Sequence, residues 1–195
     1  DLARQHYDYT LIGIDNCRQQ YSSCAKALNA ATVQVKTEYV IYSHQDIELP
    51  DADMLGNFVD YLFMTQEEDI LGVAGAVEEC FFGGHTDFFL HHPFDEKLCD
   101  NWHLYGVERC MYTRAKGNKV YVCDIPLIHT STGTISRAYN KGFYRVAKRY
   151  AGEDEGEGTT SLKWLRTVCG SSQTDLLHRL LFYWKREILI RLNRY

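Results

Sequence analysis

A cluster of polar side chains follows an apolar segment near residue 40. Residues 39–43 (YVIYS) are of types that favour a buried strand, and His44, Gln45 and Asp46 come directly after them. A carboxylate has no structural need to stand at the end of an apolar strand. Because Mg²⁺ and Mn²⁺ prefer carboxylate and water oxygens together with substrate phosphates, Asp46 is a candidate metal ligand. His44 could add an imidazole ligand or bond a phosphate, or, like Gln45, it could simply satisfy backbone groups of the loop.

Two other strand ends carry residues of similar chemistry. Asp15 closes the apolar run 9–15 (YTLIGID), where a carboxylate can accept hydrogen bonds from a nucleotide base or ribose. With Asn16 it could equally form a turn. His129 closes the segment 118–129 ahead of a small polar loop, and it is a candidate second contact to a metal or a phosphate. A histidine at a strand end is often only hydrogen-bonded, so both interpretations stay open.

Candidates for a general acid or base lie between residues 94 and 110. A general base must lie within hydrogen-bond reach of the proton that it takes, and spacing alone does not establish this. In a helix over 101–117, Tyr105 and Glu108 would share a face, and His103 would be displaced from them. Each candidate could equally be a solvated charge. The candidates are Asp95, Glu96, Asp100, His103 and Glu108.

The chain alternates between segments typical of strands and segments typical of helices. Strands are predicted at 9–15, 38–44, 69–79 and 118–129, and helices at 22–35, 51–66, 101–117 and 135–152. The strand segments are apolar throughout, which is typical of a parallel sheet covered on both faces. The sequence therefore predicts an α/β fold with a mostly parallel central sheet, helices on both faces and ligands at the carboxyl ends of the strands. Residues 81–96, with two glycines and three histidines, are predicted to form a loop.

Composition and charge limit the classes of function. The 195 residues are enough for one α/β domain, and 45% hydrophobic with 24% charged residues is a normal globular balance. The formal net charge of −5 gives no indication of nucleic-acid binding. No apolar run approaches the ~20 residues of a membrane span. The seven cysteines form no CxxC pair, so we expect neither a disulfide framework nor a zinc ribbon, and a reducing cytoplasm fits best.

The last residues, 171–195, are predicted to form an amphipathic basic helix after a main domain over residues 1–170. Beyond Asp175 this segment has five basic residues against Glu187. Such a helix can lie on an anionic membrane surface or pack in a protein interface, including that of a homodimer. Packing against its own domain is the simpler alternative.

Short motifs occur along the chain in the order found in one enzyme family. The motifs are YTLIGIDN, CAKALNAAT, EYVIYSHQDIEL, ILGVAGA, PFDEKL and NWHLYGVERC, the last continuing to a late HTSTG. On these motifs, which span about residues 7–150, the chain resembles family 2-type glycosyltransferases of the glycosyltransferase A fold. It is most similar to a bacterial subgroup with HQD in place of the DxD motif and with a WHLY helix.

The resemblance implies an activity, a metal and a set of contacts. Family 2-type enzymes transfer a sugar from a nucleotide-diphosphate sugar to an acceptor hydroxyl with inversion, here to a glycan or lipid-linked acceptor in bacterial surface polysaccharide synthesis. By position, Asp46 and His129 would hold Mn²⁺ or Mg²⁺ on the diphosphate, which is the leaving group. Asp15, Asn29 and His44 would contact the donor nucleotide or its diphosphate. The enzyme would work in the cytoplasm or at the inner face of the membrane.

Three features depart from the family pattern. His44 replaces the first Asp of the DxD motif. Gly106 stands where a catalytic Asp is often found, which leaves Glu108 or His103 as the base. The first strand of the fold is absent from this sequence. The departures at His44 and Gly106 favour an alternative, a non-catalytic sugar-nucleotide-binding or assembly subunit on the same fold. A nucleotidyltransferase would need a Gly-rich, basic phosphate loop, and none is visible in the sequence.

Overall fold

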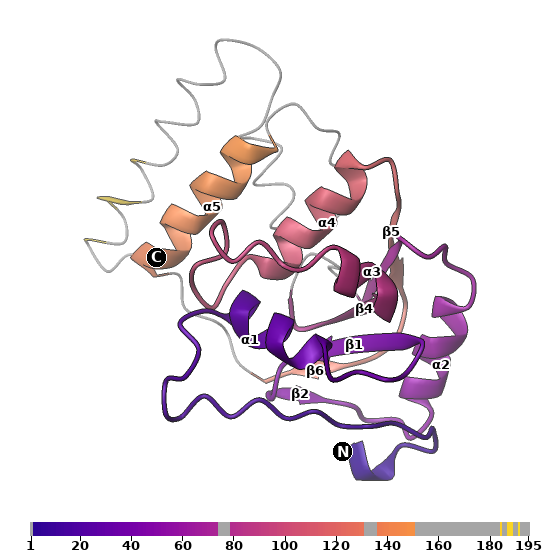
Figure 1. Ribbon diagram of the computed structural model, residues 1–195. Coiled ribbons are helices and arrows are strands. Elements are labelled where there is room, and N and C mark those ends of the chain that lie inside the picture. Colours follow the sequence, from indigo (N-terminus) through magenta and orange to yellow (C-terminus); the bar gives the residue numbers. More distant parts are fainter. Residues whose placement is uncertain are drawn as a thin grey trace.

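The computed structural model describes residues 2–73, 79–130 and 136–150, together with Trp184, Glu187, Ile188 and Arg191. These residues form an α/β fold with a four-stranded sheet and a separate two-stranded ladder (Figure 1). In chain order the elements are the 3₁₀ helix η1 (Leu2–Arg4), α1 (Cys24–Thr32), β1 (Tyr39–Ser43), β2 (Ile47–Glu48), α2 (Met54–Leu62), β3 (Ile70–Val73), β4 (Phe81–His85), α3 (Thr86–His91), α4 (Tyr105–Ala115), β5 (Val120–Cys123), β6 (Ile128–His129) and α5 (Arg137–Arg149).

The four-stranded sheet has the order β1-β4-β3-β5. Strand β4 is antiparallel to both of its neighbours, β1 and β3, whereas β3 and β5 are parallel. Strands β1, β3 and β5 therefore run in one direction, and β4 runs against them. The α/β class is confirmed, and the sheet is mixed because β4 lies between two strands that share a direction.

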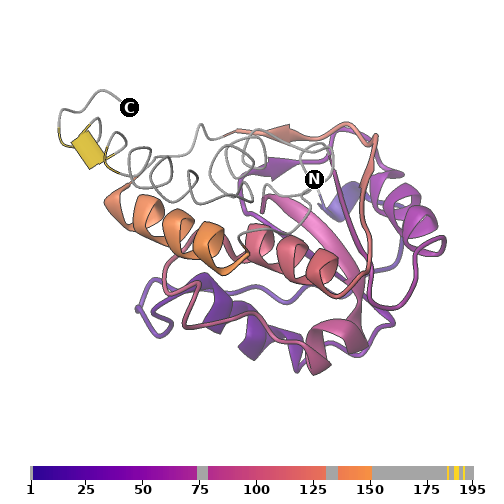
Figure 2. The same cartoon turned by 90° about the horizontal axis from the view of Figure 1, so that it is seen from above.

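Both faces of the sheet are buried, each under its own hydrophobic cluster. One cluster gathers side chains of α1, α3, α4 and α5 against the sheet, and the other gathers those of α2. Figures 1 and 2 show how these helices are placed around the sheet. The neighbours Phe81 and Phe82 of β4 point into opposite clusters, as successive strand residues must. All four residues of β3 are buried, which explains why its sequence is apolar throughout.

Two serines cap the N-termini of α1 and α5, which contribute side chains to the same hydrophobic cluster. The backbone N–H of Lys26 donates to Oγ of Ser23 at 3.3 Å, and the N–H of Tyr139 donates to Oγ of Ser136 at 3.1 Å. A side-chain oxygen in this position satisfies one of the N–H groups that lack a partner in the first turn of a helix. Helices α1 and α5 begin two residues after the predicted starts at 22 and 135.

The strand predicted over residues 9–15 does not form. Leu11 and Ile14 are exposed there, and the segment has no strand partner among the described residues. Asp15 instead accepts a hydrogen bond from the backbone N–H of Cys17 at 2.8 Å, which closes a turn. The prediction was wrong because an apolar, β-branched run becomes a strand only when a neighbouring strand shares its backbone hydrogen bonds.

The loop predicted over residues 81–96 is also wrong for residues 81–91, which form β4 and α3. The glycine pair that suggested a loop lies inside β4. A Cβ atom added to Gly83 would collide with the carbonyl oxygen of Val40 on the neighbouring strand. The glycine therefore allows a close approach of β1 and β4 rather than a turn.

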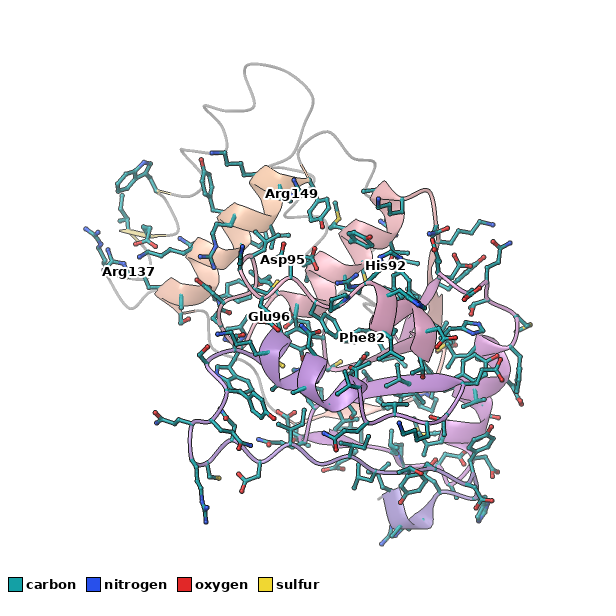
Figure 3. All side chains as sticks on the ribbon, viewed as in Figure 1. Phe82, His92, Asp95, Glu96, Arg137 and Arg149 are labelled. Atoms are coloured by element: carbon teal, nitrogen blue, oxygen red, sulfur yellow. The ribbon has the colours of Figure 1, made fainter. Side chains whose placement is uncertain are left out.

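Most of the predicted C-terminal helix, and the predicted domain boundary at residue 170, lie outside the described residues. Trp184, Glu187, Ile188 and Arg191 are helical. Glu187 is buried and accepts hydrogen bonds from Nε of Arg137 and Nδ2 of Asn140, each at 3.0 Å. Both donors lie in the first turn of α5, and Figure 3 labels Arg137 there. Within the described part of the chain, no helix combines the length and the apolar character needed to cross a membrane.

Candidate metal centre

Three of the predicted ligands lie together where β1 ends. The loop after β1 is held by the N–H of His44, which donates to the carbonyl of Cys80 at 2.9 Å. The carbonyl of Asp46 accepts from the N–H of Thr130 at 3.0 Å and from its hydroxyl at 3.1 Å. Pairing of Ile47 with His129 in the β2–β6 ladder completes the link. Backbone contacts therefore bring His129 to a position beside Asp46.

The side-chain atoms of the cluster formed by His44, Asp46 and His129 have the spacing of metal ligands. Nε2 of His129 lies 3.3 Å from Oδ2 of Asp46, and Nδ1 of His44 lies 3.8 Å from Oδ1 of Asp46. One ligand atom from each residue lies within 4.8 Å of the other two. Atoms bound at about 2.1 Å from one ion are roughly 3 Å apart when adjacent and about 4.2 Å apart when opposite. The cluster could therefore hold a divalent cation, with positions left for water or substrate oxygens.

The electrostatics around His44 favour a neutral imidazole at this position. Burial lowers the pKa of His44; Asp46 acts in the opposite direction, and the nearby His129 and His103 lower the pKa further. Burial also lowers the pKa of His103, whose ring packs edge-on against Tyr139 at 5.3 Å between centroids. A histidine binds a metal through an unprotonated nitrogen, so these shifts favour binding near neutral pH. His103 is thus an electrostatic neighbour of the cluster.

Tyr105 is a member of the site that spacing did not reveal. Its hydroxyl lies 2.7 Å from Nε2 of His44 and donates to the carbonyl of Glu79 at 3.3 Å, and the residue is buried. Sequence reasoning paired Tyr105 with Glu108 on one helix face, and gave no signal toward a histidine 61 positions away. Only the packing of α4 against the end of β1 brings the two rings together.

The backbone at the beginning of α4 makes this packing possible. Leu104 has a left-handed φ of 71°, a conformation uncommon for a residue other than glycine and found mostly where surrounding structure enforces it. A Cβ atom added to Gly106 would lie 2.9 Å from Cγ of Glu79 and 3.3 Å from Cε1 of Phe82. Position 106 therefore has no room for the catalytic Asp that the resemblance implies there.

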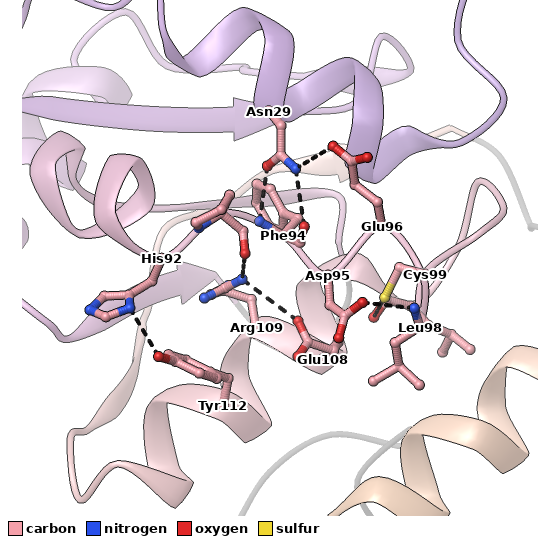
Figure 4. Close-up of polar contacts among 12 residues, drawn as sticks. Asn29, His92, Phe94, Asp95, Glu96, Leu98, Cys99, Glu108, Arg109 and Tyr112 are labelled. Atoms are coloured by element: carbon pink, nitrogen blue, oxygen red, sulfur yellow. Dashed lines mark hydrogen bonds and ion pairs between the residues drawn. The ribbon is translucent and has the colours of Figure 1, made fainter.

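Glu108, one of the two predicted bases, lies on α4, and its side chain is buried on the side of α5. Its Oε1 accepts a hydrogen bond from the hydroxyl of Tyr150 at 2.5 Å. Its Oε2 lies 3.8 Å from Nη2 of Arg109, a contact drawn in Figure 4. Burial raises the pKa of Glu108, although Arg109 and Tyr150 lower it in part. Its partners in this arrangement are protein groups, and a role as base stays a prediction.

Asn29 connects α1 to the segment that follows α3. Its Nδ2 donates to the carbonyl of Phe94 and to Oε1 of Glu96, each at 3.0 Å, and its Oδ1 accepts from the N–H of Phe94 at 2.9 Å (Figure 4). Both hydrogens of the amide are therefore engaged. The predicted donor contact of Asn29 stays a prediction, while its bonds explain why an Asn stands here.

Asp15 and Glu48 lie outside the cluster. Asp15 is exposed in its turn, where hydrogen bonds from the side chain and backbone of Cys17 lower the pKa of its carboxyl group. The contact of Asp15 with a nucleotide base stays a prediction. Glu48 is exposed on β2.

A hollow of about 250 Å³ lies at the opposite end of β1 from the cluster. Nε2 of His85 and Oγ1 of Thr86 have no hydrogen-bond partner there, but neither atom is exposed to solvent. The hollow is separate from the candidate metal centre. Its lining residues are Thr37, Glu38, Glu67, His85, Thr86 and Asp87.

No protein-family model matches this chain, and no curated protein matches it. Function is therefore inferred from the residues of the candidate metal centre and from the motif resemblance.

Proposed function

We propose that the protein transfers a sugar, with inversion, from a nucleotide-diphosphate sugar to an acceptor hydroxyl. The observation that supports this most is the gathering of His44, Asp46 and His129 at the end of β1. These are the residues that the motif resemblance assigns to the donor diphosphate. The acceptor would be a glycan or lipid-linked glycan of a bacterial surface polysaccharide.

The donor set indicates which cation the site would take. Asp46 supplies a carboxylate, His129 supplies Nε2, and His44 supplies Nδ1. Two imidazoles beside one carboxylate suit Mn²⁺ better than Mg²⁺, which prefers an all-oxygen shell. When bound, the cation would neutralise the charge that develops on the departing diphosphate.

The reaction also needs a group that takes the acceptor proton. His103 is half-buried, burial lowers its pKa, and it is close enough to His44 to lower the pKa of that residue. A neutral imidazole is therefore available near the cluster to act as a base. The acceptor oxygen would bond to the anomeric carbon as the bond to the diphosphate breaks on the opposite face. The acceptor proton would pass to His103, and the configuration would invert.

Calorimetry with UDP, GDP and TDP in the presence of Mn²⁺ tests the proposal. We expect one nucleotide to bind, and we expect Asp46→Asn to abolish binding of both the cation and the nucleotide. Asp60→Asn, which changes an exposed carboxylate on α2, should leave binding unchanged. Absence of nucleotide binding by the wild type, or equal binding by Asp46→Asn, would refute the proposed function.

The burial of Glu108 favours a second candidate, a sugar-nucleotide-binding or assembly subunit without transfer activity. The carboxylate nearest in sequence to the expected catalytic position is already bonded to Tyr150. Donor hydrolysis separates the two functions. Slow release of free sugar, lost in His103→Ala, supports the transferase, whereas binding without any turnover supports the subunit.

A further inference from the structure

We propose that Tyr105 is a positioning residue that determines which ring nitrogen of His44 is available to a metal ion. The inference rests on the proposed metal centre and extends it from the ligands to the group behind them. Tyr105 touches no substrate in this assignment. It acts through a chain of hydrogen bonds that runs from Glu79 through Tyr105 to His44.

The contacts of the Tyr105 hydroxyl define this chain. The oxygen lies 2.7 Å from Nε2 of His44 and 3.3 Å from the carbonyl oxygen of Glu79. Tyr105 is 2% exposed, so water does not compete freely for its hydroxyl. Cys24 also interacts with Tyr105, but a thiol is a weak donor and a weak acceptor.

The position of each hydrogen follows from what each group can do. A carbonyl oxygen can only accept, so the single hydroxyl hydrogen of Tyr105 points to Glu79. The lone pairs of the hydroxyl then face Nε2 of His44, and that nitrogen must carry the hydrogen. A neutral imidazole has one N–H, so Nδ1 of His44 keeps its lone pair.

The other tautomer of His44 gains little from its surroundings. A hydrogen on Nδ1 would point toward Asp46, whose Oδ1 is 3.8 Å away and beyond hydrogen-bond distance. Nε2 would then need a hydrogen from Tyr105, and the bond from Tyr105 to the carbonyl of Glu79 would be broken. The bond network therefore favours the Nε2–H form, which leaves Nδ1 free on the side of Asp46.

The fold holds Tyr105 in place for this task. The left-handed Leu104 precedes it, and Gly106 follows it where a side chain would strike Glu79. Groups that orient a metal-binding histidine through its second nitrogen typically change metal affinity by about 10–100-fold when removed. We therefore expect a measurable loss of affinity from a change that leaves all three ligands intact.

The test compares Tyr105→Phe with Tyr112→Phe. Tyr112 lies on the same helix, α4, and its hydroxyl is 2.9 Å from Nδ1 of His92, away from the candidate metal centre. Mn²⁺ affinity would be measured by calorimetry and by the spin resonance of free Mn²⁺, with folding checked by circular dichroism. We expect Tyr105→Phe to bind Mn²⁺ about 10–100-fold more weakly, and Tyr112→Phe to match the wild type. Equal affinities in the two variants, with Asp46→Asn unable to bind, would overturn the role of Tyr105 and leave the metal centre standing.

A second measurement reads the tautomer directly in the wild-type protein without metal. Long-range ¹H–¹⁵N correlation spectra show which ring nitrogen of His44 carries the hydrogen. We expect the hydrogen on Nε2 in the wild type and in Tyr112→Phe, with a shift toward Nδ1 in Tyr105→Phe. A hydrogen on Nδ1 in the wild type would overturn the inference. If the wild type has the Nε2–H form but binds no Mn²⁺, the tautomer assignment holds while the proposed function fails.

Discussion

The hydroxyl of Tyr150, just after α5, donates to Oε1 of Glu108 on α4 across 2.5 Å, and both residues are buried. This bond joins the two helices beside the ion pair of Glu108 with Arg109. Burial raises the pKa of Glu108 above its ordinary 4.5, so the folded protein holds this proton more tightly than the unfolded chain does. The stability that the proton contributes is therefore greatest in acid and is lost as pH rises from about 4.5 through the raised pKa.

We therefore expect the unfolding free energy of the wild type to fall, relative to that of Glu108→Gln, as pH rises above about 4.5. Gln keeps an oxygen for Tyr150 but has no proton to lose in this range. Urea unfolding of both proteins between about pH 4 and pH 7 measures the difference. Glu67→Gln, at an exposed position, should follow the wild type. A constant difference between the wild type and Glu108→Gln would contradict the shift.

Gly106→Ala should destabilise the protein and weaken the metal centre together. The added Cβ would lie 2.9 Å from Cγ of Glu79, so α4 must move away from the residue that orients Tyr105. Overpacking of this kind typically costs about 1–3 kcal/mol. Gly13→Ala, where nothing lies within 4 Å, is the matched control and should be nearly neutral. Denaturant unfolding and Mn²⁺ titration of both variants check this, and equal stability would show that the helix yields without cost.

Mn²⁺ should stabilise the protein more than Mg²⁺ does at the same concentration. The cation would bind the folded cluster of His44, Asp46 and His129, and a ligand at a hundred times its dissociation constant adds about 2.7 kcal/mol. Thermal unfolding with each cation measures the effect. His129→Ala should remove most of the Mn²⁺-induced rise in melting temperature, while His91→Ala should preserve it. A preference for Mg²⁺ would argue against imidazole ligands.

Asn29→Ala should lower stability by about 1–3 kcal/mol, because it leaves the carbonyl and the N–H of Phe94 without their partner. Asn57→Ala, which changes an exposed amide on α2, should stay within about 0.5 kcal/mol of the wild type. Nucleotide affinity, measured on the same proteins, then separates two roles. Loss of nucleotide binding without loss of stability would favour the donor contact implied by the resemblance over the structural one.

The C-terminal segment should mediate contact with an anionic membrane surface or with a second copy of the chain. Trp184 and Ile188 are each 55% exposed, whereas Glu187 is buried against α5. Flotation with anionic vesicles and sedimentation velocity would compare the full chain with one ending at Gly170. An unchanged result in both measurements would assign the segment to ordinary packing. Association with vesicles would support a location at the inner face of the membrane.

The sequence predicted the elements whose burial can be read from local periodicity. Helix α2 carries Leu55, Phe58 and Leu62 on one buried face, and β3 is apolar at every position, so both were found. Residues 9–15 have a similar composition but form no strand, because composition does not reveal whether a partner strand is present. At Gly83 the error was the reverse, because a strand was predicted as a loop. In the sequence, a glycine that allows close approach of a neighbouring strand cannot be distinguished from one that forms a turn.

The sequence predicted only those residues of the candidate site that lie at the ends of apolar segments. Asp46 and His129 each follow or end an apolar segment, and the ends of neighbouring segments meet at one edge of the fold. Tyr105 meets His44 through the packing of a helix against a strand, for which the sequence contains no periodic signal. The sequence also did not predict the partners of Glu108 and Asn29, because each residue bonds to a partner more than 40 positions away in the chain.

The central position of β4 has a consequence for how the chain assembles. Strands β1 and β3 both pair with β4, which is made after them, so each leaves the ribosome with an edge that has no partner. The β2–β6 ladder can form only after residues 128 and 129 have been made, long after residue 48. Contacts of such wide separation form slowly. The candidate metal ligands therefore come together only after residue 129 has been made, and affinity for Mn²⁺ would report formation of the β2–β6 ladder during synthesis.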